Sequence, residues 1–261
     1  MLKQRVVTAL IAVAALLLVL FALPQAAAQL VVAALILAGA WEWSGFLGTP
    51  SNALRALYVI FIAVLMALAT WVVPDIEGLA FRMALVWWVC ALVWMLFYPT
   101  PIPGIVRWIA GALVLLPLYE ALIVLYLASP IILLGALLIV WAADTGAFVA
   151  GKLFGRVKLA PKISPGKTWE GVVGGLLLVA LLAAVVAVWR DASFAVLLPF
   201  CLAVAAISIV GDLTVSMFKR TTGVKDSGAL FPGHGGVLDR VDSVAAAAPL
   251  FALGVTWLGF A

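Results

Sequence analysis

The chain has 261 residues, of which 67% are hydrophobic and only 10% are charged, and its formal net charge is +4. Its mean hydropathy is +1.31. A soluble domain is usually about 45–50% apolar and about 25% charged, so this composition excludes a soluble globular protein. The surface itself has to face lipid, and we predict an integral membrane protein that forms a single domain over residues 1–261.

Apolar runs divide the chain into segments of membrane-spanning length, because a spanning helix needs about 20 mainly apolar residues. The predicted fold is an all-α integral membrane protein, a polytopic bundle of about nine transmembrane helices. Pro117 makes the fifth span a candidate for a kink or a split. The predicted spans cover residues 6–23, 26–46, 53–73, 78–97, 105–128, 130–150, 170–190, 194–218 and 243–260.

The first apolar segment has two interpretations. Lys3 and Arg5 precede it, and the three alanines at 26–28 resemble the cleavage site of a secretory signal peptide. The apolar core of a signal peptide usually has only about 7–15 residues, and this run is longer. We therefore favour a retained membrane anchor.

Lysine and arginine set the expected orientation, because they concentrate in cytoplasmic loops. With the N-terminus in the cytoplasm, Arg82 and Arg190 are the only two of the 15 cations that fall outside. The polar loops 151–171 and 219–242 then face the cytoplasm and the C-terminus lies outside. The spans of residues 1–128 form the N-terminal part, and residues 129–261 carry both polar loops.

The polar loop 151–171 has five cations and one acid, Glu170. A topology signal that touches anionic lipid headgroups explains this charge. Ser164, Lys167 and Thr168 also lie just before the seventh span, and the free N–H groups at a helix start attract anions. This favours a phosphate site. It is not expected to be a P-loop, because position 161 is Pro and a preceding strand is implausible here.

Asp144 stands at the end of the sixth span. A carboxylate at that depth is costly and tends to face a cavity or a partner. Thr145 and Gly146 beside it allow a close helix contact or the approach of a ligand. The alternative interpretation pairs Asp144 with a lysine of the following loop.

The end of the eighth span carries a polar stripe. Asp212 and Ser216 share a helix face and Lys219 continues it, with Arg220 beside it. An acid within the span, followed by a hydroxyl and a cation, is not typical of a lipid-facing surface. We expect the stripe to face inward.

A glycine-rich loop follows and leads into the ninth span. Asp239 and Asp242 share a helix face there, and like charges so close need a positive partner. Arg240 is one interpretation of that partner, and a divalent cation is the other, because hard cations prefer carboxylate oxygens. His234 has no second histidine or cysteine nearby, so a zinc site is not expected.

Acids and cations are thus mixed towards one side of the membrane. This mixture is typical of phosphate chemistry, in which acids hold Mg²⁺ and Mg²⁺ with Lys or Arg neutralises phosphoryl oxygens. A proton or ion pathway would instead place its acids near the middle of the membrane.

The stretch from Ser216 to Asp242 resembles, without departure and at fixed spacing, the signature of phosphatidate cytidylyltransferases, also called CDP-diacylglycerol synthases. The segment 164–171 and the many spans are similar to this family as well. The resemblance rests on Ser216, Phe218, Lys219, Arg220, Lys225, Asp226, Gly228, Phe231, Pro232, His234, Gly235, Gly236, Val237, Asp239, Arg240, Val241 and Asp242.

The resemblance implies a nucleotidyltransferase of phospholipid biosynthesis that transfers CMP from CTP to phosphatidate, giving CDP-diacylglycerol and pyrophosphate. It implies dependence on Mg²⁺, with one or two ions, and a homodimer of nine-span subunits with a cytoplasmic, lipid-accessible site in the C-terminal part. The expected partners are CTP, phosphatidate and the membrane, and no nucleic acid. The compact length and the lack of organelle-targeting features favour a bacterial inner membrane.

The resemblance also implies roles for individual residues. Asp212 and Asp239 are expected to bind metal, with Asp144 or Asp242 as a further or indirect ligand. His234 either donates a hydrogen bond or acts as an acid–base group, or it only fixes the loop, and Asp226 orients Lys225 or takes part in catalysis. The expected phosphate and substrate contacts are Lys219, Arg220, Lys225, Arg240, Ser164, Lys167, Thr168, Ser216, Gly235 and Gly236.

Two other functions stay open from the sequence. A CTP-dependent lipid kinase, or another lipid-phosphate transferase, would use the same acids and cations. An ion or proton transporter could run past Glu42, Glu120 and Asp144. Against the transporter, Glu42 lies between Trp41 and Trp43, as expected of an interface anchor.

Overall fold

Helices form most of the computed structural model, which describes residues 2–48, 51–71, 76–228, 230 and 235–258. The N-terminal part contains α1 (Leu2–Phe21), α2 (Gln25–Ser44), the short 3-10 helix η1 (Gly45–Leu47), α3 (Asn52–Trp71), α4 (Ile76–Leu96) and α5 (Gly104–Ala128). The C-terminal part contains α6 (Pro130–Phe154), β1 (Lys158–Ala160), β2 (Ser164–Thr168), α7 (Trp169–Arg190), α8 (Phe194–Thr221) and α9 (Leu238–Leu258).

Eight helices in the described ranges, α2 to α9, are long and apolar enough to cross a membrane, so the prediction of an all-α polytopic protein is confirmed. The predicted first span corresponds to α1, whose apolar stretch is the shorter run Leu10–Phe21 within the searched residues. Its crossing of the membrane stays a prediction. Pro117 lies inside α5, which runs unbroken, so the fifth span is not split.

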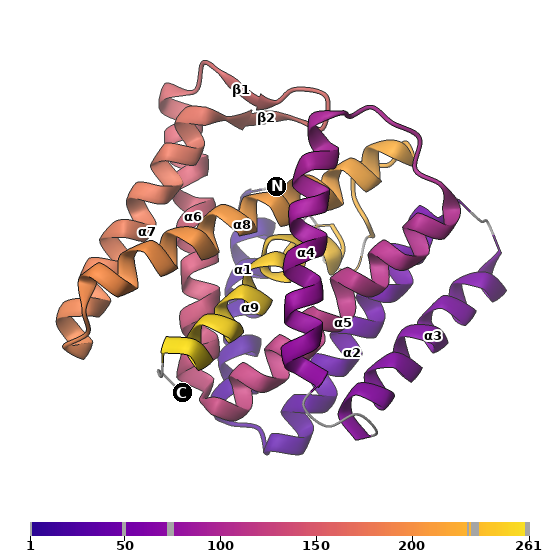
Figure 1. Cartoon of the computed structure of the whole chain (residues 1–261), viewed down its shortest axis with the longest axis horizontal. Helices are drawn as coiled ribbons and strands as arrows, with labels where there is room; N and C mark the ends of the chain where they lie inside the picture. Colours follow the sequence, from indigo (N-terminus) through magenta and orange to yellow (C-terminus); the bar gives the residue numbers. More distant parts are fainter. Residues whose placement is uncertain (1, 49–50, 72–75, 229, 231–234, 259–261) are drawn as a thin grey trace.

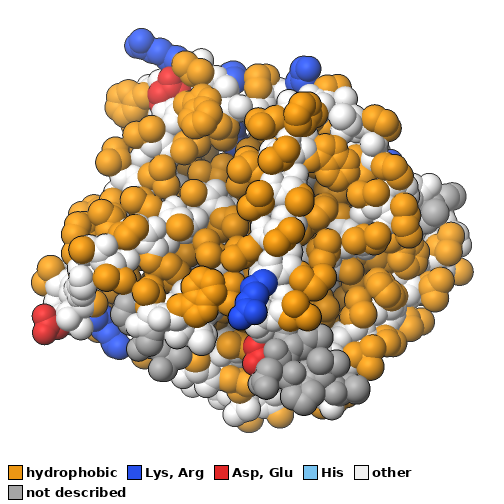
Figure 2. Space-filling view, in the orientation of Figure 1, with side chains coloured by type: hydrophobic (Ala, Val, Ile, Leu, Met, Phe, Trp, Pro, Cys, Tyr) orange, Lys and Arg blue, Asp and Glu red, His pale blue; other side chains and the backbone are white. Residues whose placement is uncertain are grey.

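α9 is the central helix of the bundle. It packs against α4, α5, α6 and α8, and 72% of its apolar window is buried, against 22% for α3 and 28% for α7. Figure 1 shows α9 behind α4, with α8 crossing the bundle obliquely. The face seen in Figure 2 is mostly hydrophobic, and its charged side chains lie mainly near the upper and lower edges, as expected where a lipid-facing belt ends.

Glycines bring α6 and α7 into backbone contact. A Cβ atom on Gly175 would lie 2.6 Å from the Ala143 carbonyl oxygen, and one on Gly146 would lie 2.6 Å from that of Gly174. Small residues at a membrane helix interface permit this close approach. The predicted close helix contact at Gly146 is therefore confirmed, and it fixes the height of Asp144 relative to the start of α7.

α8 and α9 meet just as closely. A Cβ atom on Gly211 would lie 2.5 Å from the carbonyl oxygen of Asp242. α9 also begins at Leu238, five residues before the predicted start of the ninth span. Asp239 and Asp242 therefore both belong to the helix, beside the polar end of α8.

A two-stranded antiparallel hairpin connects α6 to α7. Lys158 pairs with Thr168 and Ala160 with Ser164, with an irregularity between these pairs. The expectation that a strand is implausible before α7 is thus wrong, because the short strand β2 ends directly at the helix. Figure 1 shows the hairpin at the upper edge, above α6 and α7.

Candidate functional site

A cavity of about 510 Å³ opens beneath the hairpin, and we call it the hairpin cavity. It brings together five of the predicted site residues from three separate segments of the chain. Its polar lining comes from Asp144, Lys152, Ser164, Lys167, Thr168 and Asp212, and its apolar lining includes Phe148, Leu159, Val172 and Ile209. Polar and apolar walls in one cavity suit a ligand with a charged head and hydrocarbon chains.

An ion pair crosses this cavity. Lys167 Nζ, on β2, lies 2.5 Å from Asp212 Oδ2, on α8. The other oxygen of Asp212 accepts a hydrogen bond from Ser216 Oγ at 3.2 Å, one helical turn further on. The predicted inward-facing stripe on α8 is confirmed. The alternative prediction paired Asp144 with a lysine of this loop, but Lys167 forms its ion pair with Asp212.

Two further carboxylates lie within electrostatic range of Asp212. Asp212 interacts with Asp144 on α6 and with Asp242 on α9. Lys167 acts on both of these acids, and Arg240 acts on Asp144. The close helix contacts at glycines explain how acids from three helices reach one region, since each contact brings two backbones together.

A second ion pair joins the end of α8 to the start of α9. Lys219 Nζ lies 2.7 Å from Asp239 Oδ1. Asp239 Oδ2 accepts hydrogen bonds of 2.9 Å from the backbone N–H groups of Ser227 and Gly236. Arg240 was one predicted neutraliser of Asp239, but Lys219 holds that position and Arg240 is exposed.

Gly235 has a backbone φ of +82°, a conformation that favours glycine. A Cβ atom there would lie 2.5 Å from Asp239 Oδ2. Both the turn and the close approach to the carboxylate thus require glycine at this position.

Of the other predicted site residues, two form hydrogen bonds that hold the fold and two are exposed. Thr168 Oγ1 accepts a hydrogen bond from Gly171 N at 3.2 Å and caps α7. Arg220 Nε donates to the Ile163 carbonyl oxygen at 3.2 Å, which ties α8 to the hairpin turn. Lys225 and Asp226 are both exposed, and no ion pair joins them in the described structure. His234 lies outside the described residues.

Glu42 is the polar residue whose position the sequence did not predict. It does not act as an interface anchor. Its carboxylate accepts hydrogen bonds from Val237 N and Leu238 N, both 2.9 Å, and from Ser227 Oγ at 2.8 Å. The only sequence signal was an acid between two tryptophans near the end of a span. The hydrogen-bond partners of Glu42 lie 185 to 196 residues away in the chain, so the sequence did not indicate them.

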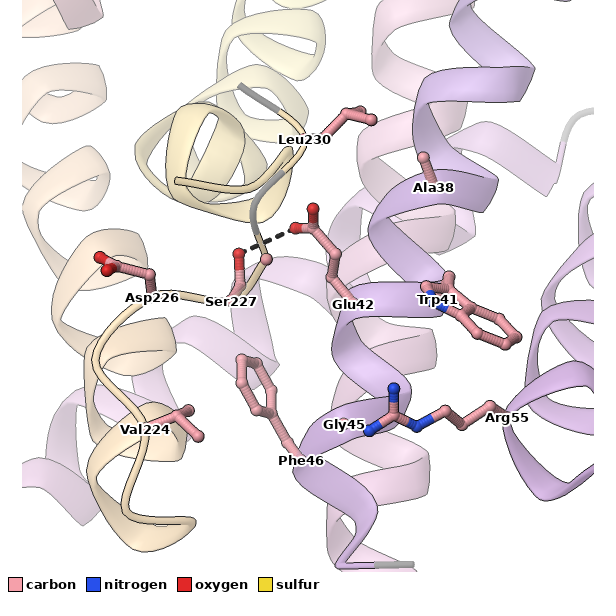
Figure 3. Close-up of a pocket in the computed structure, with 11 residues that line it drawn as sticks. Ala38, Trp41, Glu42, Gly45, Phe46, Arg55, Val224, Asp226, Ser227 and Leu230 are labelled. Carbon is pink, nitrogen blue, oxygen red and sulfur yellow. Dashed lines mark hydrogen bonds between the residues drawn. The ribbon is translucent and has the colours of Figure 1, made fainter. Parts of the chain in front are cut away.

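Glu42 borders a second cavity, of about 650 Å³, between the end of α2, the start of α3 and the loop that joins α8 to α9, which we call the glycine loop. Figure 3 shows its carboxylate pointing toward Ser227, with Arg55 and Trp41 on the far side and the Asp226 side chain pointing away from it. We call this the loop cavity. Its lining residues are Ala38, Trp41, Glu42, Gly45, Phe46, Arg55, Val224, Asp226, Ser227, Gly228 and Leu230.

The hairpin cavity offers suitable ligands for Mg²⁺, the metal that the sequence resemblance implies. Mg²⁺ is commonly held by one or two carboxylates, with water and phosphate oxygens completing its shell. Asp144 and Asp212 line the cavity and supply such carboxylates. In the part of the chain that the structure describes, no three His, Cys, Asp or Glu side chains are grouped to hold one ion. Asp239 is not among the residues that line this cavity, so it fits less well as a ligand there.

Known proteins resemble this chain over nearly its whole length. The family model described as the cytidylyltransferase family matches residues 3–258. A phosphatidate cytidylyltransferase of Pseudomonas aeruginosa is 44% identical over 281 residues, covering 97% of this chain and 96% of that protein. One of Haemophilus influenzae is 36% identical, with 96% and 97% covered.

A shorter match falls on a Staphylococcus saprophyticus protein of the same name, which is 47% identical over 120 residues and covers 45% of this chain. The family model and the two long matches span the N-terminal helices as well as the polar loops, so the similarity is not confined to one motif. The chain therefore belongs to the cytidylyltransferase family.

Proposed function

We propose that this protein transfers CMP from CTP to phosphatidate, giving CDP-diacylglycerol and pyrophosphate. The observation that carries the proposal is the hairpin cavity, in which Asp144, Lys167 and Asp212 face apolar walls. The two relatives that align along almost the whole chain are named phosphatidate cytidylyltransferases, and this supports the choice of substrates.

In the proposed reaction, a phosphate oxygen of phosphatidate attacks the α-phosphorus of CTP, and the bond from that phosphorus to the pyrophosphate oxygen breaks. Such a transfer needs positioning and charge neutralisation more than covalent help from the protein. Lys167 is placed to neutralise a phosphoryl oxygen, because its ammonium group lies in the cavity and is held there by Asp212. A bound phosphate would replace Asp212 as the ion-pair partner of Lys167 and would leave that carboxylate free.

Mg²⁺ would supply further neutralisation of the phosphoryl oxygens, held by Asp212 and Asp144 with Asp242 nearby. Lys219, about two helical turns beyond Asp212 on α8, and Asp239, at the start of α9, would hold the glycine loop. Arg220, Lys225 and Arg240, which are all exposed, remain proposed phosphate contacts.

The proposal includes a location and an assembly. We place the site on the cytoplasmic face of a bacterial inner membrane, with the N-terminus inside, the C-terminus outside and two subunits in a homodimer. The asymmetry of the 15 Lys and Arg residues supports the orientation. CTP is dissolved in water and phosphatidate is held in the bilayer, so the site has to lie at about headgroup depth.

The test uses purified protein in detergent with phosphatidate, Mg²⁺ and CTP labelled in its α-phosphate. We expect label to move into the organic phase as CDP-diacylglycerol, and Asp212→Asn to abolish this transfer. Asp191→Asn is the matched control, because Asp191 is an exposed acid in the turn between α7 and α8. Absence of labelled lipid with folded protein would overturn the proposal. Phosphorylation of a lipid alcohol would identify the kinase alternative, and nucleotide-independent ion flux the transporter.

A further inference from the structure

Glu42 connects two parts of the chain that the sequence separates widely. It stands near the end of α2, and its three hydrogen-bond donors come from both ends of the glycine loop, 223–238. Ser227 belongs to the first end of this loop, and Val237 and Leu238 belong to the second, where α9 begins. One carboxylate therefore fixes the distance between the two ends of the loop.

The same carboxylate stabilises the start of α9. The first N–H groups of a helix have no partner within the helix, and negative charge is favourable at this end. Leu238 is the first residue of α9, and its N–H donates to Glu42 Oε2 while Val237 N–H donates to Oε1. Glu42 thus acts as an N-terminal cap supplied by a distant helix.

The backbone at two glycines packs closely against this carboxylate. A Cβ atom on Gly228 or on Gly236 would collide with the carboxylate of Glu42. These two glycines come from the two loop segments that Glu42 joins. The side chain therefore packs against the loop backbone as well as being hydrogen-bonded to it.

The loop amides around Glu42 also hold Asp239. Ser227 donates through its side chain to Glu42 and through its backbone N–H to Asp239 Oδ2, and Gly236 N–H donates to the same Asp239 oxygen. Asp239 in turn holds Lys219. A shift at Glu42 would therefore move Asp239 and Lys219 together.

We infer that Glu42 is a positioning residue for the transfer reaction, which sets the placement of Asp239 and Lys219 by clamping both ends of the glycine loop. Glu42 is not among the residues that line the hairpin cavity, so it acts through these two residues. The inference rests on the proposed function for its kinetic part and on the hydrogen bonds alone for its structural part.

Glu42→Gln tests this inference, because the amide has one acceptor oxygen where the carboxylate has two. At least one of the N–H groups of Val237 and Leu238 then loses its acceptor. We expect kcat for CMP transfer to fall about 100-fold, as for a small misplacement of a catalytic group, with KM for CTP little changed. Asp191→Asn, which removes an exposed carboxylate elsewhere, is expected to leave kcat unchanged.

Hydrogen exchange of the full-length protein in detergent gives a readout independent of activity. In Glu42→Gln the amides of Val237 and Leu238 should exchange faster, while those in the middle of α5 stay protected. A purely structural role would instead lower the unfolding temperature and the folded fraction, and would leave kcat per folded molecule unchanged. Wild-type kcat in Glu42→Gln, or unchanged exchange at both amides, would overturn the inference.

Ser227→Ala keeps the test decisive if Glu42→Gln does not fold, because it removes only the hydroxyl donor at 2.8 Å. We expect a smaller fall in kcat, and an unaltered kcat would then count against the clamp. If wild-type protein makes no CDP-lipid, the proposed function fails, whereas the exchange rates still decide whether Glu42 holds the loop.

Discussion

Lys219 and Asp239 form a 2.7 Å ion pair between the end of α8 and the start of α9, with side chains only 11% and 7% exposed. Each charge has been removed from water, and each therefore depends on the other. Asp239 also accepts hydrogen bonds from the backbone N–H groups of Ser227 and Gly236. The ion pair therefore joins α8, α9 and the glycine loop at one point.

Removing one member of this pair should destabilise the protein strongly. Asp239→Asn leaves the buried ammonium of Lys219 without its counter-charge, and breaking a buried pair costs about 3–5 kcal/mol of the free energy of unfolding. The double variant Lys219→Met with Asp239→Asn should regain part of this loss, since no charge is left uncompensated. Thermal unfolding in detergent checks both, and equal midpoints for the single and double variants would contradict the expectation.

Lys167 should matter far more than its neighbour Lys162. Lys167→Met removes the ammonium that lies 2.5 Å from Asp212, so it leaves that acid unpaired and takes a cation from the proposed phosphate site. We expect the initial rate of CMP transfer to fall about 100-fold or more. Lys162→Met alters an exposed lysine of the same hairpin and should stay near the wild-type rate. Equal rates for the two variants would remove Lys167 from the site.

Two glycines with similar backbone angles should respond differently to alanine. Gly223 and Gly235 have φ values of +74° and +82°, so a side chain at either is strained by about 1–2 kcal/mol. Only at Gly235 would the new Cβ approach a functional group, 2.5 Å from Asp239 Oδ2, whereas at Gly223 nothing lies within 4 Å. We expect Gly235→Ala to lower kcat as well as stability, and Gly223→Ala to lower stability alone. The measurement is kcat per folded molecule in both variants.

The contact between α6 and α7 should not tolerate a methyl group. In Gly175→Ala the Cβ would lie 2.6 Å from the Ala143 carbonyl oxygen, so the helices must separate and Asp144 must move. We expect a lower unfolding temperature together with reduced transfer. Gly78→Ala, where nothing lies within 4 Å, should keep activity and raise stability by up to about 1 kcal/mol. Unchanged stability and transfer in Gly175→Ala would show that α6 and α7 can separate slightly without affecting the site.

The proposed orientation can be checked with single cysteines in a chain whose Cys90 and Cys201 are replaced. Cysteines introduced at Lys162, in the hairpin, and at Asp191, in the α7–α8 turn, are exposed positions on opposite sides of the predicted spans. A membrane-impermeant thiol reagent applied to intact cells should label position 191 and spare position 162. The reverse pattern would invert the proposed topology.

Hydrophobic runs alone predicted seven of the eight spanning helices to within a few residues. The ends of α6 and α8 and the start of α9 were less accurate, because their polar residues were assigned to loops. Asp239 and Asp242 lowered the apolar signal at the start of α9, although Leu238 already begins the helix. A polar residue near a helix end is tolerated when the fold supplies a hydrogen-bond or ion-pair partner, and a single sequence does not show that partner.

The sequence predicted which polar residues would lie together, but it did not predict how they pair. Asp144, Lys167 and Asp212 line one cavity, but the hairpin beside it was not predicted. Its strand β2 has no alternation of apolar and polar residues that would indicate a strand. Glu42 was misread because its role comes from a contact across the bundle, between the second helix and the ninth.

The glycine contacts between α6 and α7 also bear on how a lipid can reach the hairpin cavity. Ala143, Ala147, Gly151 and Gly171 belong both to the cavity wall and to this seam, where the two backbones touch. Hydrocarbon cannot slip between helices whose main chains are already in van der Waals contact. The α6–α7 contact therefore closes one side of the hairpin cavity. A phospholipid whose headgroup occupies the cavity must place its acyl chains on another side of this helix pair.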